Sequence, residues 1–506
     1  MSHQLHPTQR TPSKSLLSAV DFGNEAGDDL TPIELLPFFV EQATFQKYLD
    51  PNQRILLATA KKGVGKSALL RWIEAKMNAD PSSKPLVIYA KGSDLVRGCF
   101  NLSNELKSPN DYIRDWMIRI ATLVNRRLGS SLNIAFDDDS MSMVEAAEIE
   151  GFRSKNLLSA LTDRLPNLLN KRIQSKKTTP KNDVELLRRF EGQTVWFLVD
   201  DLDATYQRTP QENLELSTFF SACRQLVSQT KGVVFRITMR TDVWPLIRRF
   251  DEALDKFEQY THDIAWSQAD FRKVLYKRIL HQATTKNMPD SPAPQTASSE
   301  EVEEHMINRI FEKRMPWGDT ERRTYKVVYT LSYHRPRWAI QLCKLGQKAA
   351  LQDGSELIAK RHIDEVWGTY GNKRIADLIA EHKHQCSEVE ELLVGFRGAE
   401  RRMTREKLLA WVTNRIKNHM TPIIEGKPAS TPLEIAHFLF RIGFIVARAE
   451  EGEDYEHYYY SDMPDFLSMR TNQDFGVIWE IHPCYREALD IKKLGKYQQK
   501  RRNLAR

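Results

Sequence analysis

The sequence has little of what marks disulfide-rich or metal-binding proteins. Its five cysteines are scattered over 506 residues without any C-x-x-C spacing: Cys99, Cys223, Cys343, Cys386 and Cys484. Neither a disulfide framework nor a zinc finger is therefore indicated, and we expect reduced thiols. The segment "HKHQC" sets His382, His384 and Cys386 at alternate positions, which would bring ligands together only on a strand, whereas the surrounding pattern is helical. The sequence does not favour a metal site there.

Long apolar runs are also missing. No run approaches the roughly 20 residues needed to cross a bilayer. The N-terminus lacks the basic segment and apolar core of a secretory signal. We therefore expect a soluble, cytoplasmic protein that does not bind a membrane.

The excess of one charge is small, since 74 lysines and arginines against 67 acids give a net charge of +7. Its distribution is uneven, because basic runs occupy residues 171–181 ("KRIQSKKTTPK") and the tail from Lys492 ("KKLGKYQQKRRNLAR"). Such runs are most often solvated segments, and phosphate-binding patches are the alternative. The tail is the candidate segment for binding DNA.

What the sequence does contain is a candidate phosphate loop. The apolar run at residues 55–57 leads into "ATAKKGVGKSALL" (residues 58–70), which predicts a strand, a loop and a helix. Glycines at 63 and 65 permit backbone conformations that turn successive N–H groups into one concavity at the positive end of the helix. Lys66 would contact the β- and γ-phosphates of a nucleotide, and the Ser67 hydroxyl would bind Mg²⁺.

Ala60 stands where the usual pattern G-x-x-x-x-G-K-[ST] has its first glycine. We expect this change to be tolerated, because the later glycines allow the close approach and position 60 need not take a positive φ. The alternative interpretation is a lysine-rich surface loop, which the strand and helix around it disfavour. The predicted phosphate-binding residues are Ala60, Lys61, Lys62, Gly63, Val64, Gly65, Lys66, Ser67 and Ala68.

A second motif, "TVWFLVDDLD" (residues 194–203), is a nearly continuous apolar strand that ends in acids. Because open parallel sheets bind ligands at the carboxyl ends of their strands, these acids should face the phosphate loop. We predict that Asp200 holds Mg²⁺ and that Asp201 orients or deprotonates the attacking water, with Asp203 assisting. The alternative is a solvated acidic turn. No strand is followed by an N-K-x-D motif and no L-S-G-G-Q signature occurs, so ATP is favoured over GTP.

Strands that alternate with helices predict an α/β fold, with a parallel sheet covered by helices. Composition and pattern then divide the chain into a flexible N-terminal arm (1–30), a P-loop ATPase domain (31–282), a linker or disordered loop (283–300), a helical lid (301–380), a winged-helix domain (381–490) and a basic tail (491–506).

The winged-helix prediction comes from the order of elements near the C-terminus. Thr431, Pro432 and Glu434 form a capping box with proline at the first helical position, and the helix should end at Gly443. Two β-rich stretches around the turn "AEEGED" then predict a hairpin. Helix, helix and hairpin is the order of a winged helix.

Taken in order, "AKKGVGKS", "VWFLVDDLD", "FRITMRTDVW" and "HRPRWAI", with the winged-helix pattern after them, resemble the AAA+ and STAND group of P-loop ATPases. Within that group the chain looks most similar to origin-recognition-like members and to bacterial signalling or defence ATPases. The resemblance is good over residues 35–351 and looser in the tail. The first two motifs are specific to P-loop NTPases as a whole, and the later ones discriminate within them weakly.

The resemblance implies roles for several arginines. Arg240 stands where such proteins place a sensor of the γ-phosphate, Arg337 where the lid contributes a second sensor, and Arg248 or Arg249 where an arginine finger acts on a neighbouring subunit. Surface ion pairs are the alternative for all four. Asp201 stands where many AAA+ proteins have glutamate, a departure that resembles STAND proteins and bears on the hydrolysis rate.

We therefore expect an ATPase that binds ATP with Mg²⁺, hydrolyses it slowly and couples nucleotide state to partner recognition or self-assembly. The resemblance suggests bacterial antiviral defence as its setting. The alternative is a DNA-binding AAA+ ATPase of replication or transposition type. A metabolic kinase fits less well, because no small-substrate domain is evident.

Overall fold

The computed structural model describes residues 16–25, 27–79, 85–92, 95, 108–131, 187, 194–204, 206, 209–250, 252–288, 293–318, 320–451, 454–468 and 476–492. The basic run at 171–181 and the tail beyond Lys492 lie outside the described residues. The chain divides into two compact units: Ala26–Trp266, and Met1–Glu25 together with Ser267–Arg506. We call these the nucleotide unit and the lid unit.

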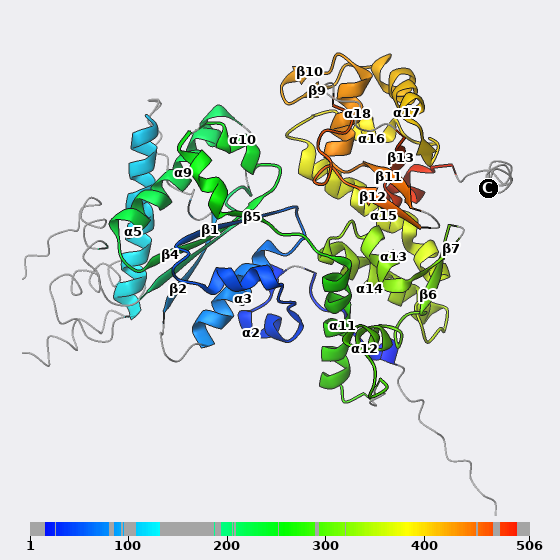
Figure 1. The fold of residues 1–506 in the computed structure, drawn as a ribbon, viewed down its shortest axis with the longest axis horizontal. Coiled ribbons are helices and arrows are strands. Elements are labelled where there is room, and N and C mark those ends of the chain that lie inside the picture. The colour runs from blue at the N-terminus through cyan, green and yellow to red at the C-terminus, as the bar shows by residue number, and fades with distance from the viewer. Residues whose placement is uncertain are drawn as a thin grey trace, which may run out of the picture. The chain divides into compact units, whose positions relative to one another are not determined.

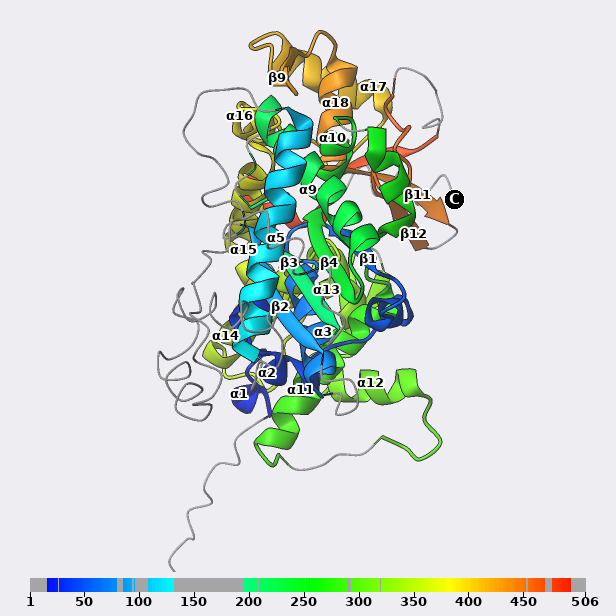
Figure 2. The same cartoon turned by 90° about the vertical axis from the view of Figure 1, so that its left-hand side faces the viewer.

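The nucleotide unit contains a five-stranded parallel sheet in the order β2-β3-β4-β1-β5 (Figure 1 and Figure 2). Its strands are β1 (Ile55–Ala60), β2 (Leu86–Lys91), β3 (Val195–Asp200), β4 (Val233–Arg240) and β5 (Thr261–Asp263). The strands predicted before the phosphate loop and before the acids are both present. Strand β4 lies between them, with Ala60 of β1 opposite Arg240 and Val199 of β3 opposite Ile237.

Helices cover both faces of this sheet, as the α/β prediction requires. Helices α5 (Pro109–Ser131) and α9 (Pro210–Gln229) are labelled in Figure 2. They share one core cluster with alternate residues of the strands, among them Phe197 and Phe235. Helix α3 (Lys66–Ala79) packs on the other face and buries Leu69, Leu70 and Ile73. The chain therefore has the α/β fold of a P-loop NTPase.

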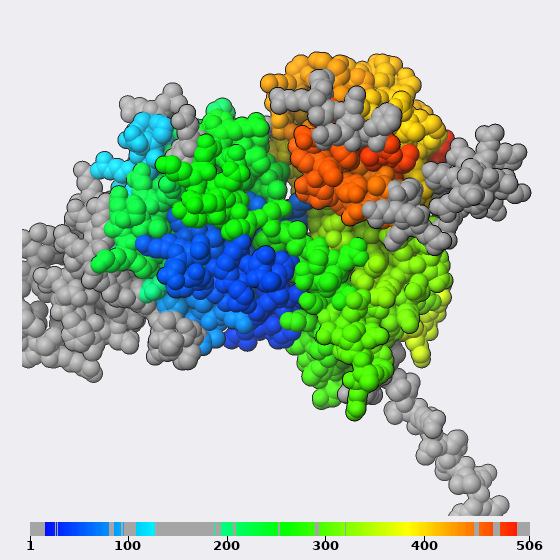
Figure 3. Space-filling model, in the orientation of Figure 1, coloured from blue at the N-terminus to red at the C-terminus, as the bar shows by residue number. Residues whose placement is uncertain are grey.

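Shorter elements complete the nucleotide unit. They are the 3₁₀ segments η1 (Gly27–Asp29), η2 (Leu36–Phe38), η3 (Ala43–Leu49) and η4 (Glu252–Tyr260) and the helices α2 (Pro32–Leu35) and α10 (Trp244–Arg248). Residues of α2, η2 and η3 form a continuous part of this unit's surface, coloured blue in Figure 3.

The lid unit is mostly helical, with small sheets. Its elements are α1 (Leu16–Ala19), α11 (Gln268–Thr285), α12 (Ser299–Ile307), β6 (Arg314–Trp317), β7 (Thr320–Arg323), α13 (Thr324–Leu331), α14 (Pro336–Gln352), α15 (Lys360–His382), α16 (Val389–Val394), β8 (Arg402–Met403), α17 (Arg405–Val412), a π-helix η5 (Thr413–Lys417), β9 (Ile423–Ile424), β10 (Lys427–Pro428), α18 (Pro432–Arg441), β11 (Ile445–Glu451), β12 (Asp454–Tyr458), β13 (Ile478–Ile481), η6 (Pro483–Tyr485) and η7 (Glu487–Leu489). In the described parts of both units, no helix is long and apolar enough to cross a membrane.

The C-terminal elements follow the predicted local pattern. Thr431 and Glu434 form the capping box of α18, with the Glu434 N–H 3.2 Å from Thr431 Oγ1, and Gly443 follows the helix with a φ of +81°. Strands β11 and β12 form the predicted antiparallel hairpin within a sheet of order β12-β11-β13-β8. The winged-helix assignment itself stays a prediction.

The predicted domain boundaries stay predictions, and two of them fall within helices. The predicted boundary at residue 282 falls inside α11, and the one at residue 380 falls inside α15. Within the predicted flexible arm, Leu16–Ala19 form α1, and Leu17 and Phe22 are buried. A short apolar stretch in a polar segment is enough to dock it, although composition averaged over the segment hides it.

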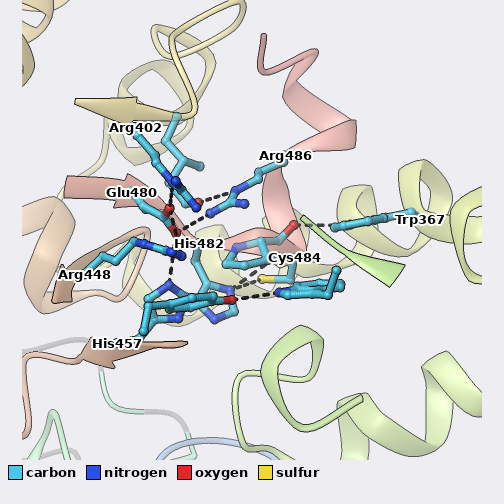
Figure 4. Close-up of polar contacts among 12 residues, drawn as sticks. Trp367, Arg402, Arg448, His457, Glu480, His482, Cys484 and Arg486 are labelled. Carbon is cyan, nitrogen blue, oxygen red and sulfur yellow. Dashed lines mark hydrogen bonds and ion pairs between the residues drawn. The ribbon is translucent and has the colours of Figure 1, made fainter. Parts of the chain in front are cut away.

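A buried carboxylate joins the strands of the C-terminal sheet. Glu480 of β13 is 1% exposed and contacts Arg402 of β8, Arg448 of β11, His457 of β12 and Arg486 (Figure 4). Its Oε2 lies 3.0 Å from His457 Nε2 and 2.8 Å from Arg486 Nη2. Burial alone would raise the pKa of Glu480, but Arg486, His457 and Arg402 hold that pKa well below its usual range.

Replacing this carboxylate should destabilise the lid unit strongly. We expect Glu480→Gln to lower the free energy of unfolding by about 3–5 kcal/mol, because the variant leaves buried guanidinium groups without an opposite charge. The folded-state pKa of Glu480 lies below the unfolded value of about 4.3, so this contribution is complete above that pH and is lost only as the pH falls through the folded value. Urea unfolding at neutral pH and at about pH 5 should therefore show the same difference from wild type.

Glu456→Gln is the matched control, because it removes the same charge from an exposed position on β12. It should change stability by less than about 0.5 kcal/mol. Equal stability of wild type and Glu480→Gln at neutral pH would contradict the role given to this carboxylate.

Candidate functional site

The loop between β1 and α3 has the backbone that its glycines were predicted to allow. Gly63 has a φ of +79° and Gly65 a φ of +119°, a region that side chains disfavour. The Leu69 N–H donates to the Gly65 carbonyl at 2.9 Å as α3 begins. The N–H groups of residues 66–68 precede this bond and have no acceptor within the helix, so they form, at the positive helix end, a site suited to an anion.

Ala60 serves the loop through its backbone. It ends β1 as an ordinary strand residue opposite Arg240 and is not among the residues with positive φ, so alanine is unstrained there. Its carbonyl accepts hydrogen bonds from Lys66 Nζ at 3.2 Å and from the Thr241 N–H at 3.3 Å. Position 60 therefore helps to orient the lysine without needing glycine.

Lys66 has the surroundings that point most directly to a ligand. The residue is 7% exposed, and within the described part of the chain its ammonium hydrogen-bonds to the Ala60 carbonyl and forms no ion pair with a carboxylate. Burying an ammonium without an opposite charge is costly. A buried cation with spare donors beside a helix N-terminus therefore fits a phosphate group.

Asp200 is the last residue of β3 and is held in one orientation by its neighbours. Its Oδ2 accepts the Tyr89 hydroxyl at 2.5 Å, and its Oδ1 accepts the Thr238 hydroxyl at 2.7 Å and the Asp201 N–H at 3.1 Å. Burial, and then the Asp200 carboxylate, raise the pKa of Tyr89, so its hydroxyl stays a donor at neutral pH. The carboxylate keeps lone-pair capacity for a metal-bound water.

Asp201, directly after the strand, differs from Asp200 in exposure and backbone. It is exposed and has a φ of +49°, an uncommon conformation for a residue other than glycine. The end of β2 passes close by, because a Cβ at Gly92 would lie 2.6 Å from the Asp201 carbonyl oxygen. Such backbone outliers cluster at functional sites, and an exposed carboxylate can accept a proton from water.

Asp203 is engaged with Arg240. Its Oδ2 accepts the Arg240 N–H at 3.1 Å and lies 2.9 Å from Arg240 Nε, and the aspartate is buried. Its contacts therefore suit it to hold the arginine rather than to assist Asp201. Arg240 Nη2 is buried and has no hydrogen-bond partner among the described atoms, so it has a donor to spare at the sheet edge where the phosphate loop begins.

The other predicted arginines lie in different settings. Arg248 Nη1 forms an ion pair with Glu258 at 3.1 Å, which agrees with the alternative interpretation of a surface ion pair. Arg249 is exposed. Arg337 belongs to the lid unit, where its Nε donates to the Glu25 carbonyl at 3.4 Å. Their roles as finger and second sensor stay predictions.

The residues present fit Mg²⁺ only together with a nucleotide. Among the described residues, no group of three or more histidines, cysteines, aspartates or glutamates could hold a metal. Mg²⁺ is commonly bound by one or two carboxylates together with phosphate oxygens and water. Ser67 and Asp200, at the same edge of the sheet, are the residues that could contribute to such a site.

Sequence reasoning missed three residues of this site. Tyr89 and Thr238 fix Asp200, and Trp266 Nε1 donates to the Val64 carbonyl of the phosphate loop at 2.7 Å. Tyr89 and Thr238 lie near the carboxyl ends of the strands on either side of β3. The strand order, once known, would have indicated both of them, but no local motif does.

No protein-family model and no curated protein matches the chain. Among solved structures it is similar to the ORC2 protein of Aeropyrum pernix in its ADPNP–ADP complexes, at 12% identity over 86% of this chain and 86% of that chain, with a TM-score of 0.38. Cdc6p from Pyrobaculum aerophilum is 12% identical over 90% and 95% of the two chains, with a TM-score of 0.31. Drosophila ORC bound to DNA is 11% identical over 96% of each, with a TM-score of 0.28. Scores this low carry no weight for fold or function, which rest on the geometry above.

Proposed function

We propose that the chain is a P-loop ATPase that binds ATP with Mg²⁺, hydrolyses it slowly and acts as a nucleotide-dependent switch of the AAA+ and STAND kind. The observation that carries this proposal is the buried Lys66 ammonium, which has no carboxylate partner in the described part of the chain. A polyphosphate at the loop would supply the opposite charge through charge-assisted hydrogen bonds.

Each residue of the site would have a separate role in binding or hydrolysis. The N–H groups of residues 66–68 and the Lys66 ammonium hold the β- and γ-phosphates. Mg²⁺, when bound, neutralises phosphate charge, and Ser67 and Asp200 would hold it. Asp201 orients or deprotonates the attacking water, and the spare Nη2 of Arg240 stabilises charge that develops on the γ-phosphate.

The predicted winged-helix domain (381–490), in this proposal, binds protein rather than DNA. The one arginine or lysine of α18, Arg441, forms an ion pair with Glu425 at 3.0 Å. In the hairpin, the Tyr455 hydroxyl accepts the Trp317 Nε1–H at 2.7 Å, and the Arg322 guanidinium stacks on its ring at 4.2 Å. These side chains therefore make contacts within the lid unit, which does not favour a DNA-binding role for them. The second candidate function, a DNA-binding ATPase of replication or transposition type, needs a DNA-reading surface in the folded chain, because the basic tail from Lys492 would add only contacts without sequence preference.

Lys66→Ala should weaken ATP binding by about 1.5–3 kcal/mol, roughly 10- to 150-fold, because a buried contact between ammonium and phosphate is lost. Titration with a fluorescent ATP analogue measures the change. Lys256→Ala is the control, since Lys256 is exposed in η4, outside the phosphate loop, and should leave ATP affinity unchanged. Wild-type affinity in Lys66→Ala would rule out the phosphate-loop assignment.

Asp201→Asn should keep ATP bound and slow its turnover, because the amide cannot accept a proton from water and leaves Asp200 in place. We expect affinity within a factor of about three of wild type and turnover reduced by about 10²-fold or more. Single-turnover hydrolysis, measured beside nucleotide titration, separates the two effects. An unchanged hydrolysis rate would place the water-activating group elsewhere.

Deleting the tail from Lys492 separates the two candidate functions. If the tail alone contacts DNA, duplex binding by the full chain falls steeply with salt and disappears on deletion. We expect this result in fluorescence anisotropy across a salt series. Sequence-selective, salt-resistant binding that survives the deletion would favour the DNA-binding ATPase instead.

A further inference from the structure

The chain passes twice between its compact units, and both passages adjoin the phosphate loop. One passage lies between Glu25 and Ala26, and the other between Trp266 and Ser267. On the side of the nucleotide unit, Gly27 packs against the first turn of α3 and Trp266 packs against the loop itself.

At the second passage, the indole of Trp266 is bonded to the loop. Its Nε1–H donates to the Val64 carbonyl at 2.7 Å, and its Cζ2 lies 3.9 Å from where a Cβ of Gly65 would stand. The next residue, Ser267, is the N-cap of α11, and its Oγ accepts the Asp270 N–H at 3.1 Å. No spacer separates Trp266, which contacts the loop, from the N-cap of α11 in the lid unit.

At the first passage, the chain lies against the same site. A Cβ at Gly27 would stand 2.9 Å from Ala68 Cβ and 3.0 Å from Ala68 N, so only glycine fits beside the first turn of α3. The N–H of Ala68 is one of the groups without an acceptor within the helix.

On the other side of that passage, within the lid unit, side chains of α11 and its C-terminal cap donate to backbone carbonyls of residues 16–25. Lys286 Nζ donates to the Ala19 carbonyl at 2.7 Å, and Arg278 Nη1 donates to the Phe22 carbonyl at 2.6 Å. These side chains come from α11 and its C-terminal cap, the helix that Trp266 leads into. Helix α11 is therefore covalently joined to Trp266 at the second passage and, with its C-terminal cap, hydrogen-bonded to residues before the first passage.

We propose that Trp266 is a positioning residue for the phosphate loop and that it transmits the nucleotide occupancy of this loop to α11. This coupling rests on the proposed binding of nucleotide at Lys66. Phosphates that engage the loop N–H groups constrain the backbone at Val64. The backbone at Val64 can then shift only if the indole follows or if a buried carbonyl loses its donor. Because Trp266 is covalently joined to the N-cap of α11, its displacement reaches the lid unit directly.

Trp266→Phe tests this coupling, because it keeps an aromatic ring and removes the N–H donor. In the wild type, ATP with Mg²⁺ should slow amide exchange in the first two turns of α11. In Trp266→Phe we expect ATP affinity within about tenfold of wild type and at least half of that exchange difference to be lost. Trp244→Phe, a buried tryptophan in the same unit, is the control and should keep the full difference.

The outcomes distinguish the coupling from the nucleotide site. Wild-type protein that binds no ATP overturns both. Trp266→Phe that binds ATP and keeps the full exchange difference overturns the coupling alone. If Trp266→Phe does not fold, benzothienylalanine at position 266, which keeps the shape of the indole and lacks its N–H, provides the same comparison.

Discussion

Parallel pairing of β4 with β1 on one side and β3 on the other fixes the positions on which the proposed site depends. The register sets Ala60 opposite Arg240 and Val199 opposite Ile237, so the phosphate loop, the arginine and the acids all emerge at one edge of the sheet. Polar groups that converge on a buried edge must satisfy one another or a ligand. Asp200 is satisfied by Tyr89 and Thr238, whereas Lys66 has a single neutral acceptor within the described chain.

Lys66 differs from other buried cations of the chain in how its donors are satisfied. Arg236 is fully buried but donates to the backbone carbonyls of Tyr48, Gln53 and Asp50, so it has a structural role in holding η3. In the lid unit, the arginines around Glu480 share a buried carboxylate. A buried cation whose donors are satisfied inside the fold has a structural role, while a buried cation that keeps donors to spare indicates a partner from outside.

Local patterns predicted much of the fold and the local backbone of the candidate site. The phosphate loop, the acidic strand and the capping box at Thr431 are signals that span a few residues, and each has the predicted backbone. The partners of Asp200 could not be found this way, because Tyr89 lies 111 residues and Thr238 lies 38 residues along the chain. The predicted domain boundaries at residues 282 and 380 stay predictions, and they fall inside α11 and α15 because these helices continue through the places where composition changes.

Calorimetric titration of the whole chain with Mg²⁺ and ATP, ADP or AMP tests the central claim most directly, because the three nucleotides differ only in phosphates. The loop N–H groups and the Lys66 ammonium are expected to hold the β- and γ-phosphates, so ATP and ADP should bind and AMP should bind at least about 100-fold more weakly. Binding of AMP as tight as that of ATP, or no binding of any of the three, would contradict the account.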